Sequence, residues 1–231
     1  NSAFGIFNTN EKLDWPFPVS LLHNSMIYHI LPGKIEDAGF PSGPNSTIRT
    51  LGGDSVYVSR NIRGFFINGI RVRTGVTLCS NGIVYQLERL QIPADGNILQ
   101  TITGLRSFDS LSKAINRVVS SPGGDPGFAT TLGSSVISVF GPDNSAFANW
   151  LQSMSLTDIN QVSVPLLLSV LRYNMIPGRV FIADLPEGQL QTTGTGSMSI
   201  HWTSTAQDFP SIKGNGNGGA DVFVLFGNVL C

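Results

Sequence analysis

The sequence is poor in charged residues. Asp, Glu, Lys and Arg make up only 13% of its 231 residues, about half of the share that is usual in soluble domains. The formal net charge is −1, so the chain has no excess of positive charge to hold a phosphate backbone, and we expect no nucleic-acid partner. The chain has 26 glycines and 13 prolines instead. They favour short strands joined by tight turns and a protein outside the cytosol.

Long hydrophobic runs are also absent. No apolar run reaches the roughly 18 residues that would span a membrane, and the longest lies at residues 165–171. Residues 1–10 lack the basic start and the apolar centre of a signal peptide. We therefore expect no membrane span in this chain, and we place any leader, lipid or other anchor outside it.

Cysteine is scarce, since Cys79 and Cys231 are the only two. Two cysteines are too few for a zinc site or a disulfide framework. They either pair with one another or remain free thiols. We expect neither a metal nor a cofactor.

The motifs of common enzyme classes are missing as well. The histidines are His23, His29 and His201, and the spacing of the first two does not place them on one helical face. No His-Glu-x-x-His, Gly-x-Ser-x-Gly or phosphate-binding Walker sequence occurs. We therefore expect no catalytic residues and a protein that is not an enzyme.

The most informative feature that is present is an internal repeat. The segment MIYHILPGKI at residues 26–35 recurs as LRYNMIPGRV at residues 171–180, an offset of 145 residues. The same offset pairs Gly69 with Gly214. Ordered matches along most of the chain indicate two tandem units.

The repeat divides the chain at a Pro-Ala-Asp-Gly connector. We predict a first domain at residues 1–95 and a second domain at residues 96–231. The tetrapeptide NSAF at residues 1–4 recurs at residues 144–147. The first domain is therefore expected to lack the counterpart of residues 97–143, and the second to lack its final strand.

Helices are expected mainly at the start of each unit. Apolar residues at three- and four-residue steps predict a helix over residues 108–118, with Ser107 as its N-cap. Asp143 is expected to cap the next helix. A further helix is expected to start at Ser163 and to end at the turn formed by Pro177 and its following glycine.

Antiparallel strands follow the helices. The turn dipeptides Asn68-Gly69 and Asn81-Gly82 each predict a two-residue hairpin. Strands are expected at residues 55–58, 64–67, 70–72, 76–78, 83–92 and 135–140. Helices followed by antiparallel strands make each unit an α+β domain.

Two motifs resemble the fasciclin-type domain. The segment VFGPDNSAF at residues 139–147 is similar to the family's first block, with Gly for Ala and Asp for Thr. The family's central Tyr-His-x-x-Pro-Gly is found at residues 28–33 and, with Asn in place of His, at residues 173–178. The resemblance implies two tandem fasciclin-type domains, each a β-sheet wedge flanked by several helices. It also implies extracellular adhesion or matrix binding.

The resemblance also points to candidate binding residues, which are Tyr28, His29, Tyr173 and Asn174. In some animal relatives the Tyr-His motif is associated with integrin binding. The alternative is structural, because a Tyr-His pair at a helix end can simply pack and satisfy local hydrogen bonds. The change from His29 to Asn174 suits that structural role.

Three further segments have ordinary explanations. Asn45 begins the one N-glycosylation sequon, which matters only in a protein of eukaryotic source. The glycine-rich segment 214–219 aligns with the Asn68-Gly69 turn, so we interpret it as a turn and not as a phosphate-binding loop. The aromatic segment 15–18 is either packed or an exposed binding patch.

The leading hypothesis is a non-enzymatic extracellular or cell-surface binding protein. It would recognise a surface or matrix protein or a polysaccharide through broad faces. One alternative is a carrier of a small hydrophobic ligand lined by Phe65, Phe66 and Trp202. Another is a hydrolase of unfamiliar arrangement that uses His29 or His201.

Overall fold

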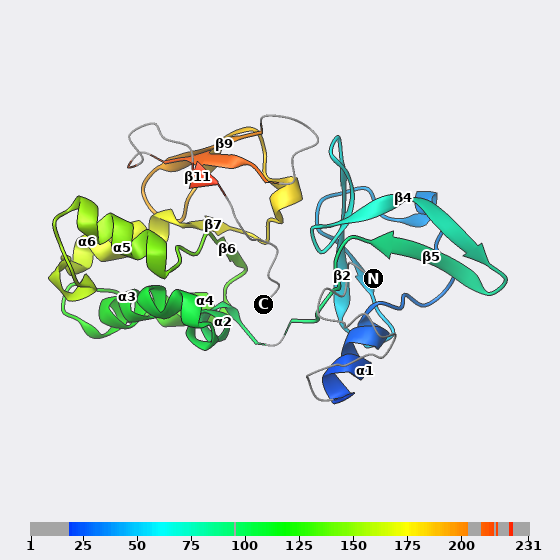
Figure 1. The fold of residues 1–231 in the computed structure, drawn as a ribbon, viewed down its shortest axis with the longest axis horizontal. Helices are drawn as coiled ribbons and strands as arrows, with labels where there is room; N and C mark the ends of the chain where they lie inside the picture. Colours follow the sequence, from blue (N-terminus) through cyan, green and yellow to red (C-terminus); the bar gives the residue numbers. More distant parts are fainter. Residues whose placement is uncertain (1–18, 95, 203–208, 215, 217–221, 224–231) are drawn as a thin grey trace, which may run out of the picture.

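The computed structural model describes residues 19–94, 96–202, 209–214, 216 and 222–223. Figure 1 shows two halves side by side, which we call the N-terminal half (residues 19–94) and the C-terminal half (residues 96–223). The aromatic segment 15–18, Cys231 and most of the glycine-rich segment 214–219 lie outside the described residues.

The N-terminal half is a helix packed against one antiparallel sheet. Its strands run in the order β1-β2-β3-β4-β5, and β4 contains a bulge between Val72 and Val76. The elements are α1 (Val19–Tyr28), the 3₁₀ turn η2 (Asp37–Gly39), β1 (Ser46–Arg49), β2 (Ser55–Asn61), β3 (Gly64–Ile67), β4 (Ile70–Cys79) and β5 (Gly82–Leu87).

One face of this sheet carries the core of the N-terminal half. Side chains alternate between the faces of a strand, so every second residue of β2 points inward, as Val56 and Val58 do at 2% and 0% exposure. Phe40 lies over these strands, with its ring centre 5.0 Å from Phe65 and 5.2 Å from Tyr85. The buried members of the core are Tyr28, Phe40, Val56, Val58, Ile67 and Val72.

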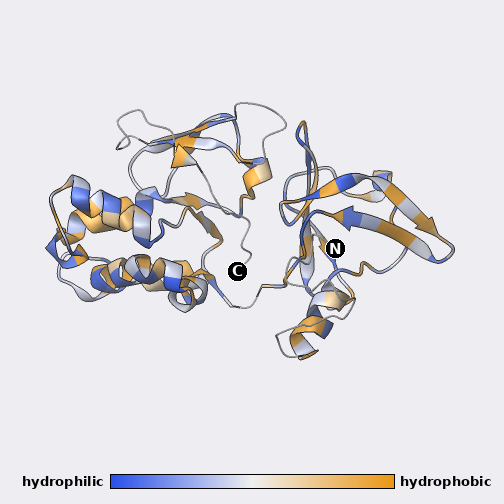
Figure 2. Ribbon diagram, viewed as in Figure 1, coloured by the Kyte–Doolittle hydropathy of each residue, from blue (hydrophilic) through white to orange (hydrophobic). Residues whose placement is uncertain are grey.

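The C-terminal half begins with a helical layer. In α3 the residues Leu111, Ala114, Ile115 and Val118 are 0–3% exposed, because the three- and four-residue spacing places them on one helical face. Figure 2 shows this alternation of hydrophobic and hydrophilic residues along the helices. The layer contains α2 (Ile98–Gly104), η3 (Arg106–Phe108), α3 (Asp109–Ser120), α4 (Phe128–Ser134), α5 (Asn144–Ser153), η4 (Ile159–Gln161) and α6 (Val164–Tyr173).

Two small sheets complete the C-terminal half. The pair β6–β7 lies beside the helical layer, and the second sheet has the order β11-β10-β9-β8. Its core is formed by Ile176, Leu185, Met198 and Ile200. The elements are β6 (Ile137–Val139), β7 (Met175–Pro177), η5 (Ile182–Asp184), β8 (Gly188–Gln191), β9 (Ser197–His201), β10 (Ser211–Lys213) and β11 (Val222–Phe223).

The repeat is visible in the structure. An offset of 145 residues carries both ends of α1 onto the ends of α6, and both ends of η2 onto the ends of η5. The order of β8 to β11 also repeats the order of β1 to β4. The α+β class and the tandem arrangement expected from the sequence are therefore confirmed.

Several local predictions need correction. Ser107 is not an N-cap, because a 3₁₀ turn precedes α3 and Phe108 takes that position. The last helix ends at Tyr173, before Pro177, because the residues between them pair as β7 with β6. In the second hairpin Cys79 pairs directly with Gly82, so Ser80 and Asn81 form the turn.

Other local predictions are confirmed. The side chain of Asp143 caps α5 by accepting from the Ala146 N–H at 2.7 Å. The Asn68-Gly69 turn joins β3 and β4 with φ of 51° and 70°. The predicted final strand is shorter than expected, since β5 ends at Leu87. None of the helices described is long and apolar enough to cross a membrane.

Candidate functional site at the junction of the two halves

Tyr28 ends α1 and lies inside the N-terminal half. Its side chain is 2% exposed, and its hydroxyl donates to the Ser55 carbonyl at 3.1 Å. The same hydroxyl accepts from Nδ2 of Asn68 at 2.9 Å. Burial raises the pKa of Tyr28 above its ordinary value, and the hydrogen bond from Asn68 acts in the opposite direction.

Both ring nitrogens of His29 are occupied by backbone groups. Nδ1 donates to the Ser25 carbonyl at 2.6 Å, and Nε2 accepts from the Gln91 N–H at 3.0 Å. A neutral ring with its proton on Nδ1 satisfies both bonds. His29 thus ties the end of α1 to the chain that follows β5.

Tyr173 and Asn174 repeat this arrangement in the C-terminal half. The Tyr173 hydroxyl donates to the Ser197 carbonyl at 2.8 Å. Nδ2 of Asn174 donates to the Val170 carbonyl at 2.9 Å, and Val170 is the repeat counterpart of Ser25. The geometry favours the structural role for these two residues and for Tyr28 and His29. As contact residues for a partner, all four stay a prediction.

The two halves meet where the outer face of the N-terminal sheet contacts η5. Ser59 donates from Oγ to Oδ2 of Asp184 at 2.6 Å. Nδ2 of Asn61 donates to the Ala183 carbonyl at 2.8 Å. Both residues lie on β2, on the face opposite Val58, so one strand face holds the C-terminal half.

Arg63 is the most heavily bonded residue of the junction. Its guanidinium donates from Nη2 to the Ala183 carbonyl at 3.0 Å and to the Leu185 carbonyl at 2.9 Å. The same group lies 4.0 Å from the ring centre of Trp202, a cation–π contact. Trp202 in turn donates from Nε1 to the Leu185 carbonyl at 3.2 Å.

Aromatic and cationic side chains also contact one another across the junction. The rings of Tyr57 and Phe181 are 6.0 Å apart, and the Arg179 guanidinium lies 4.2 Å from the Tyr57 ring centre. Nδ2 of Asn45 donates to the Arg179 carbonyl at 2.5 Å. Glycosylation of Asn45 would place a sugar on this same nitrogen, between the two halves.

Two charged groups are partly desolvated by this contact. Burial raises the pKa of Asp184 above its ordinary value, against the hydrogen bonds from Ser59 and Asn61 and the charge of Arg63. Burial lowers the pKa of Arg63, against the charges of Asp184 and Glu187. The guanidinium stays charged because its ordinary pKa is so high.

A shallow hollow opens at the rim of the junction. Phe66, Gly69, Ile182 and Ala183 belong to its lining, together with Trp202 and Phe209. Its charged lining residues are Arg63, Arg71, Glu88 and Arg89. The space would hold about one or two water molecules. It therefore suits a single small group and not a whole buried ligand.

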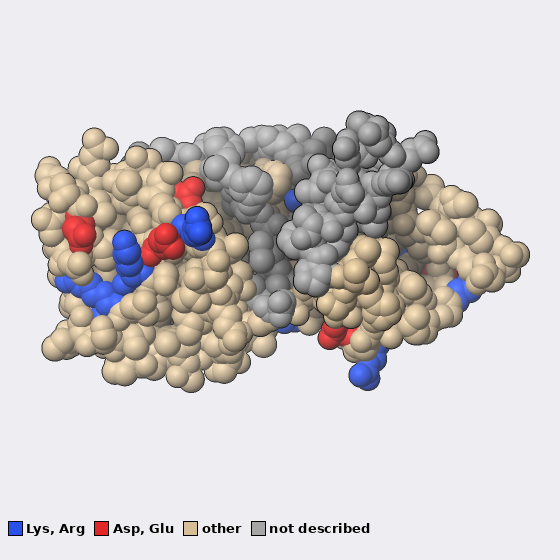
Figure 3. All heavy atoms as spheres, turned by 60° about the horizontal axis from the view of Figure 1, so that its bottom comes forward, with Lys and Arg blue, Asp and Glu red and all other residues tan. Residues whose placement is uncertain are grey.

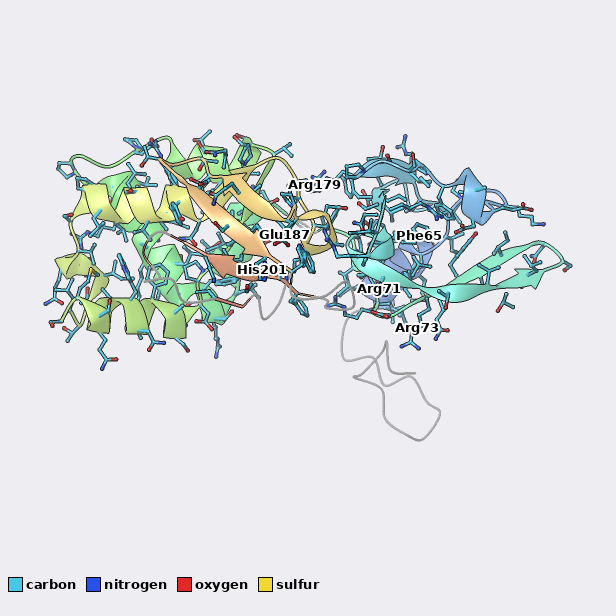
Figure 4. All side chains as sticks on the ribbon, turned by 90° about the horizontal axis from the view of Figure 1, so that it is seen from above. Phe65, Arg71, Arg73, Arg179, Glu187 and His201 are labelled. Atoms are coloured by element: carbon cyan, nitrogen blue, oxygen red, sulfur yellow. The ribbon has the colours of Figure 1, made fainter. Side chains whose placement is uncertain are left out.

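His201 and Glu187 form an exposed pair on the C-terminal half. Nδ1 of His201 lies 2.8 Å from Oε1 of Glu187, and the Trp202 N–H donates to Oε2 at 2.8 Å. Both bonds lower the pKa of Glu187, and the bond from the Trp202 N–H has the larger effect. Figure 4 shows the pair on the opposite side of the junction from Arg71 and Arg73.

Of the three aromatic residues expected to line a ligand cavity, Phe65 lies apart from the other two. Phe65 packs between Phe40 and Tyr85, with the Arg60 guanidinium 4.0 Å from its ring centre. Phe66 and Trp202 both line the shallow hollow. Among the described residues no group of three or more His, Cys, Asp or Glu is placed to hold a metal ion.

Comparison with known proteins agrees with this architecture. A sequence model described as "Fasciclin domain" matches residues 1–93 and 117–223. The chain belongs to the fasciclin domain family. The two matched stretches correspond to the two copies of the repeat, so the family to which the motifs pointed and its tandem arrangement are confirmed.

A curated relative of this fasciclin protein is human periostin. The two are 24% identical over 95 residues, which is 41% of this chain. The match spans only 11% of the length of periostin. The activity and the partners of the whole periostin protein are therefore not assigned to this chain.

The junction residues of this fasciclin protein had no signal in the sequence. Arg63 and Leu185 are separated by 122 residues, and Ser59 and Asp184 by 125. Neither pair belongs to the repeat or to a family motif. Only the docking of one unit on the other brings them together.

Proposed function

We propose that the chain is a non-enzymatic adhesion module of the extracellular space or cell surface. It is built of two fasciclin-type units, residues 1–95 and 96–231, and recognises a surface or matrix protein or a polysaccharide. The observation that carries the proposal is the bonded junction, because it joins two units into one continuous surface on a family scaffold of adhesion type. Partners of this kind are held by broad rigid faces.

The small hollow supports this proposal over the carrier hypothesis. A carrier needs a cavity that encloses most of its ligand, of about 300 Å³ or more. The rim of the junction has room for about one or two water molecules. The pair formed by His201 and Glu187 is exposed on both sides, so it offers no sheltered site for a hydrolytic reaction.

Binding to a panel of immobilised matrix proteins and polysaccharides tests the function. We expect the full chain to bind at least one member saturably in surface plasmon resonance. In a His29→Asn variant the new side chain is able to bond to the Ser25 carbonyl, as Asn174 bonds to the Val170 carbonyl in the second unit. The variant therefore removes the imidazole of the Tyr-His motif but keeps the helix-end bond. Loss of binding by a variant that still unfolds cooperatively well above the assay temperature would assign the motif as a contact, and retained binding would assign it to structure. Absence of binding to every member would contradict the proposed function.

A further inference from the structure

The sheet face that docks the C-terminal half continues beyond the junction as a basic strip. The strip consists of Arg71 and Arg73 on β4 together with Arg63 and Arg89, which line the hollow beside it. Ser59 pairs with Phe66, and Phe66 pairs with Arg71, so these side chains share one face. Arg73 is two residues further along β4 and is exposed, whereas Val72 between them is buried on the core side. Figure 4 shows Arg71 and Arg73 beside one another on this strand.

The inner arginines of this strip are held in place by the protein. Arg63 is fixed by the carbonyls of Ala183 and Leu185 and by the ring of Trp202. Nη1 of Arg71 donates to the Arg63 carbonyl at 2.5 Å, and its guanidinium lies 5.0 Å from the ring centre of Phe66. These two cations thus form a fixed positive wall along the hollow.

The outer arginines are exposed to solvent. The side chains of Arg73 and Arg89 make no hydrogen bond, ion pair or ring contact with the part of the chain that the structure describes. Among the described residues that line the hollow, Glu88 is the one acidic residue, against three arginines. The rim is therefore locally positive on a chain whose formal net charge is −1.

Another face of the molecule has a different arrangement of charge. Figure 3 shows a face on which charged side chains are few and, over the helical layer, lie with positive and negative groups side by side. A guanidinium offers a planar fork of donors that matches the oxygens of a carboxylate or sulfate. The strip has the charge and the donors to receive an anionic group, and the hollow has room for one.

We propose that this rim binds an acidic polysaccharide, with Arg73 and Arg89 contacting its carboxylate or sulfate groups beside the wall of Arg63 and Arg71. The inference rests on the proposed function and names the chemistry of the partner. Trp202 and Phe209 are half-buried walls of the hollow, and aromatic rings pack well on the C–H faces of sugars. Two exposed cations are few beside the roughly 6–10 phosphate contacts of a typical DNA-binding protein, so we favour a sugar polymer that also contacts the aromatic walls.

Calorimetric titration of the full chain with three polymers tests the proposal. Dextran sulfate supplies sulfates, hyaluronate supplies carboxylates alone, and neutral dextran supplies neither. We expect binding of one or both anionic polymers, weakening as salt is added, and none of neutral dextran. The Arg73→Glu/Arg89→Glu variant is expected to bind roughly tenfold or more weakly, because charge-assisted bonds become repulsions.

A matched control separates a site from a general charge effect. Lys113 and Arg106 are exposed on the helical layer, so the Lys113→Glu/Arg106→Glu variant makes the same change of net charge away from the junction. We expect it to bind within about twofold of the parent chain. Melting curves show whether each variant is folded.

Four results would overturn the inference. They are no binding of either anionic polymer, equal binding of neutral dextran, and equal weakening in the two charge-reversal variants. The fourth is equal binding of a single-stranded DNA oligonucleotide of similar charge, titrated in the same way. If the chain then still bound a matrix protein or another polysaccharide of the panel, the proposed function would stand without this site. If it bound nothing, both would fail.

Discussion

Asn174 occupies in the second unit the position that His29 occupies in the first, and both side chains bond to the carbonyl four residues earlier. His29 adds a second bond by accepting from the Gln91 N–H. The sequence located this pair of positions through the repeat, and the Asn-for-His change indicated a hydrogen-bonding role. The partner of Nε2 could not be predicted, since Gln91 is 62 residues away.

Substitution of His29 should therefore reveal two separable bonds. His29→Ala removes both and leaves the Gln91 N–H without its acceptor, so we expect a loss of about 1–3 kcal/mol in the free energy of unfolding. His29→Asn restores the bond to Ser25 and should lose less. Urea denaturation followed by circular dichroism measures both. Equal losses in the two variants would contradict the account of Asn174 as a replacement.

At the scale of elements, the turn between β3 and β4 is also a connection between distant segments. Asn68 is 4% exposed, and its Oδ1 accepts from the Tyr57 N–H at 2.8 Å. Its Nδ2 donates to the Tyr28 hydroxyl at 2.9 Å and to Oε1 of Gln91 at 3.1 Å. One side chain thus joins α1, β2 and the segment after β5 to the turn.

Asn68→Ala and Asn68→Gly should separate backbone strain from lost hydrogen bonds. Both variants lose the three side-chain bonds, but only alanine must adopt the positive φ of 51° with a Cβ and no compensating side chain. We expect a loss of about 2–4 kcal/mol for alanine and roughly 1 kcal/mol less for glycine. Equilibrium urea unfolding checks the difference. A glycine variant as unstable as alanine would show that backbone strain contributes little.

Elements were predicted best where local chemistry decides them. The Asn68-Gly69 hairpin needs two residues that accept positive φ, and the Asp143 cap needs a side-chain acceptor at a helix start. Prediction failed where tertiary contacts decide. Pairing with β6 turns Met175–Pro177 into a strand and ends α6 early. Nothing within the segment that follows Tyr173 indicates this partner.

The repeat also shows that packing against the helical layer decides which apolar residues are buried. Leu171 and Met175 are 4% and 2% exposed against the helical layer, whereas their counterparts Met26 and Ile30 are 37% and 48% exposed. The same apolar positions are thus buried in one unit and partly open in the other. Position in the repeat predicts residue type, but the packed neighbour decides burial.

At the scale of the whole molecule, the sequence predicted two units but not their docking. The repeat and the family motifs are properties of each unit, and both were readable from residue patterns. The polar bonds of the junction join Ser59, Asn61 and Arg63 to backbone or carboxylate groups of η5 and of Leu185, which follows it. Exposed polar residues of this kind look like ordinary surface in a sequence. Consequently the fold was largely predictable, and the candidate binding rim beside the junction was not.

Arg63 should control how firmly the two halves are docked. Arg63→Ala removes the bonds to the Ala183 and Leu185 carbonyls and the cation–π contact with Trp202, so the halves should move relative to one another. We expect a larger radius of gyration by small-angle X-ray scattering and a change in tryptophan fluorescence. Arg60→Ala is the matched control, because Arg60 stacks on Phe65 and pairs with Asp37 within the N-terminal half. An unchanged radius in the Arg63 variant, or an equal increase in the control, would mean that the junction is held by its other contacts, such as the bonds from Ser59 and Asn61, and not by this guanidinium.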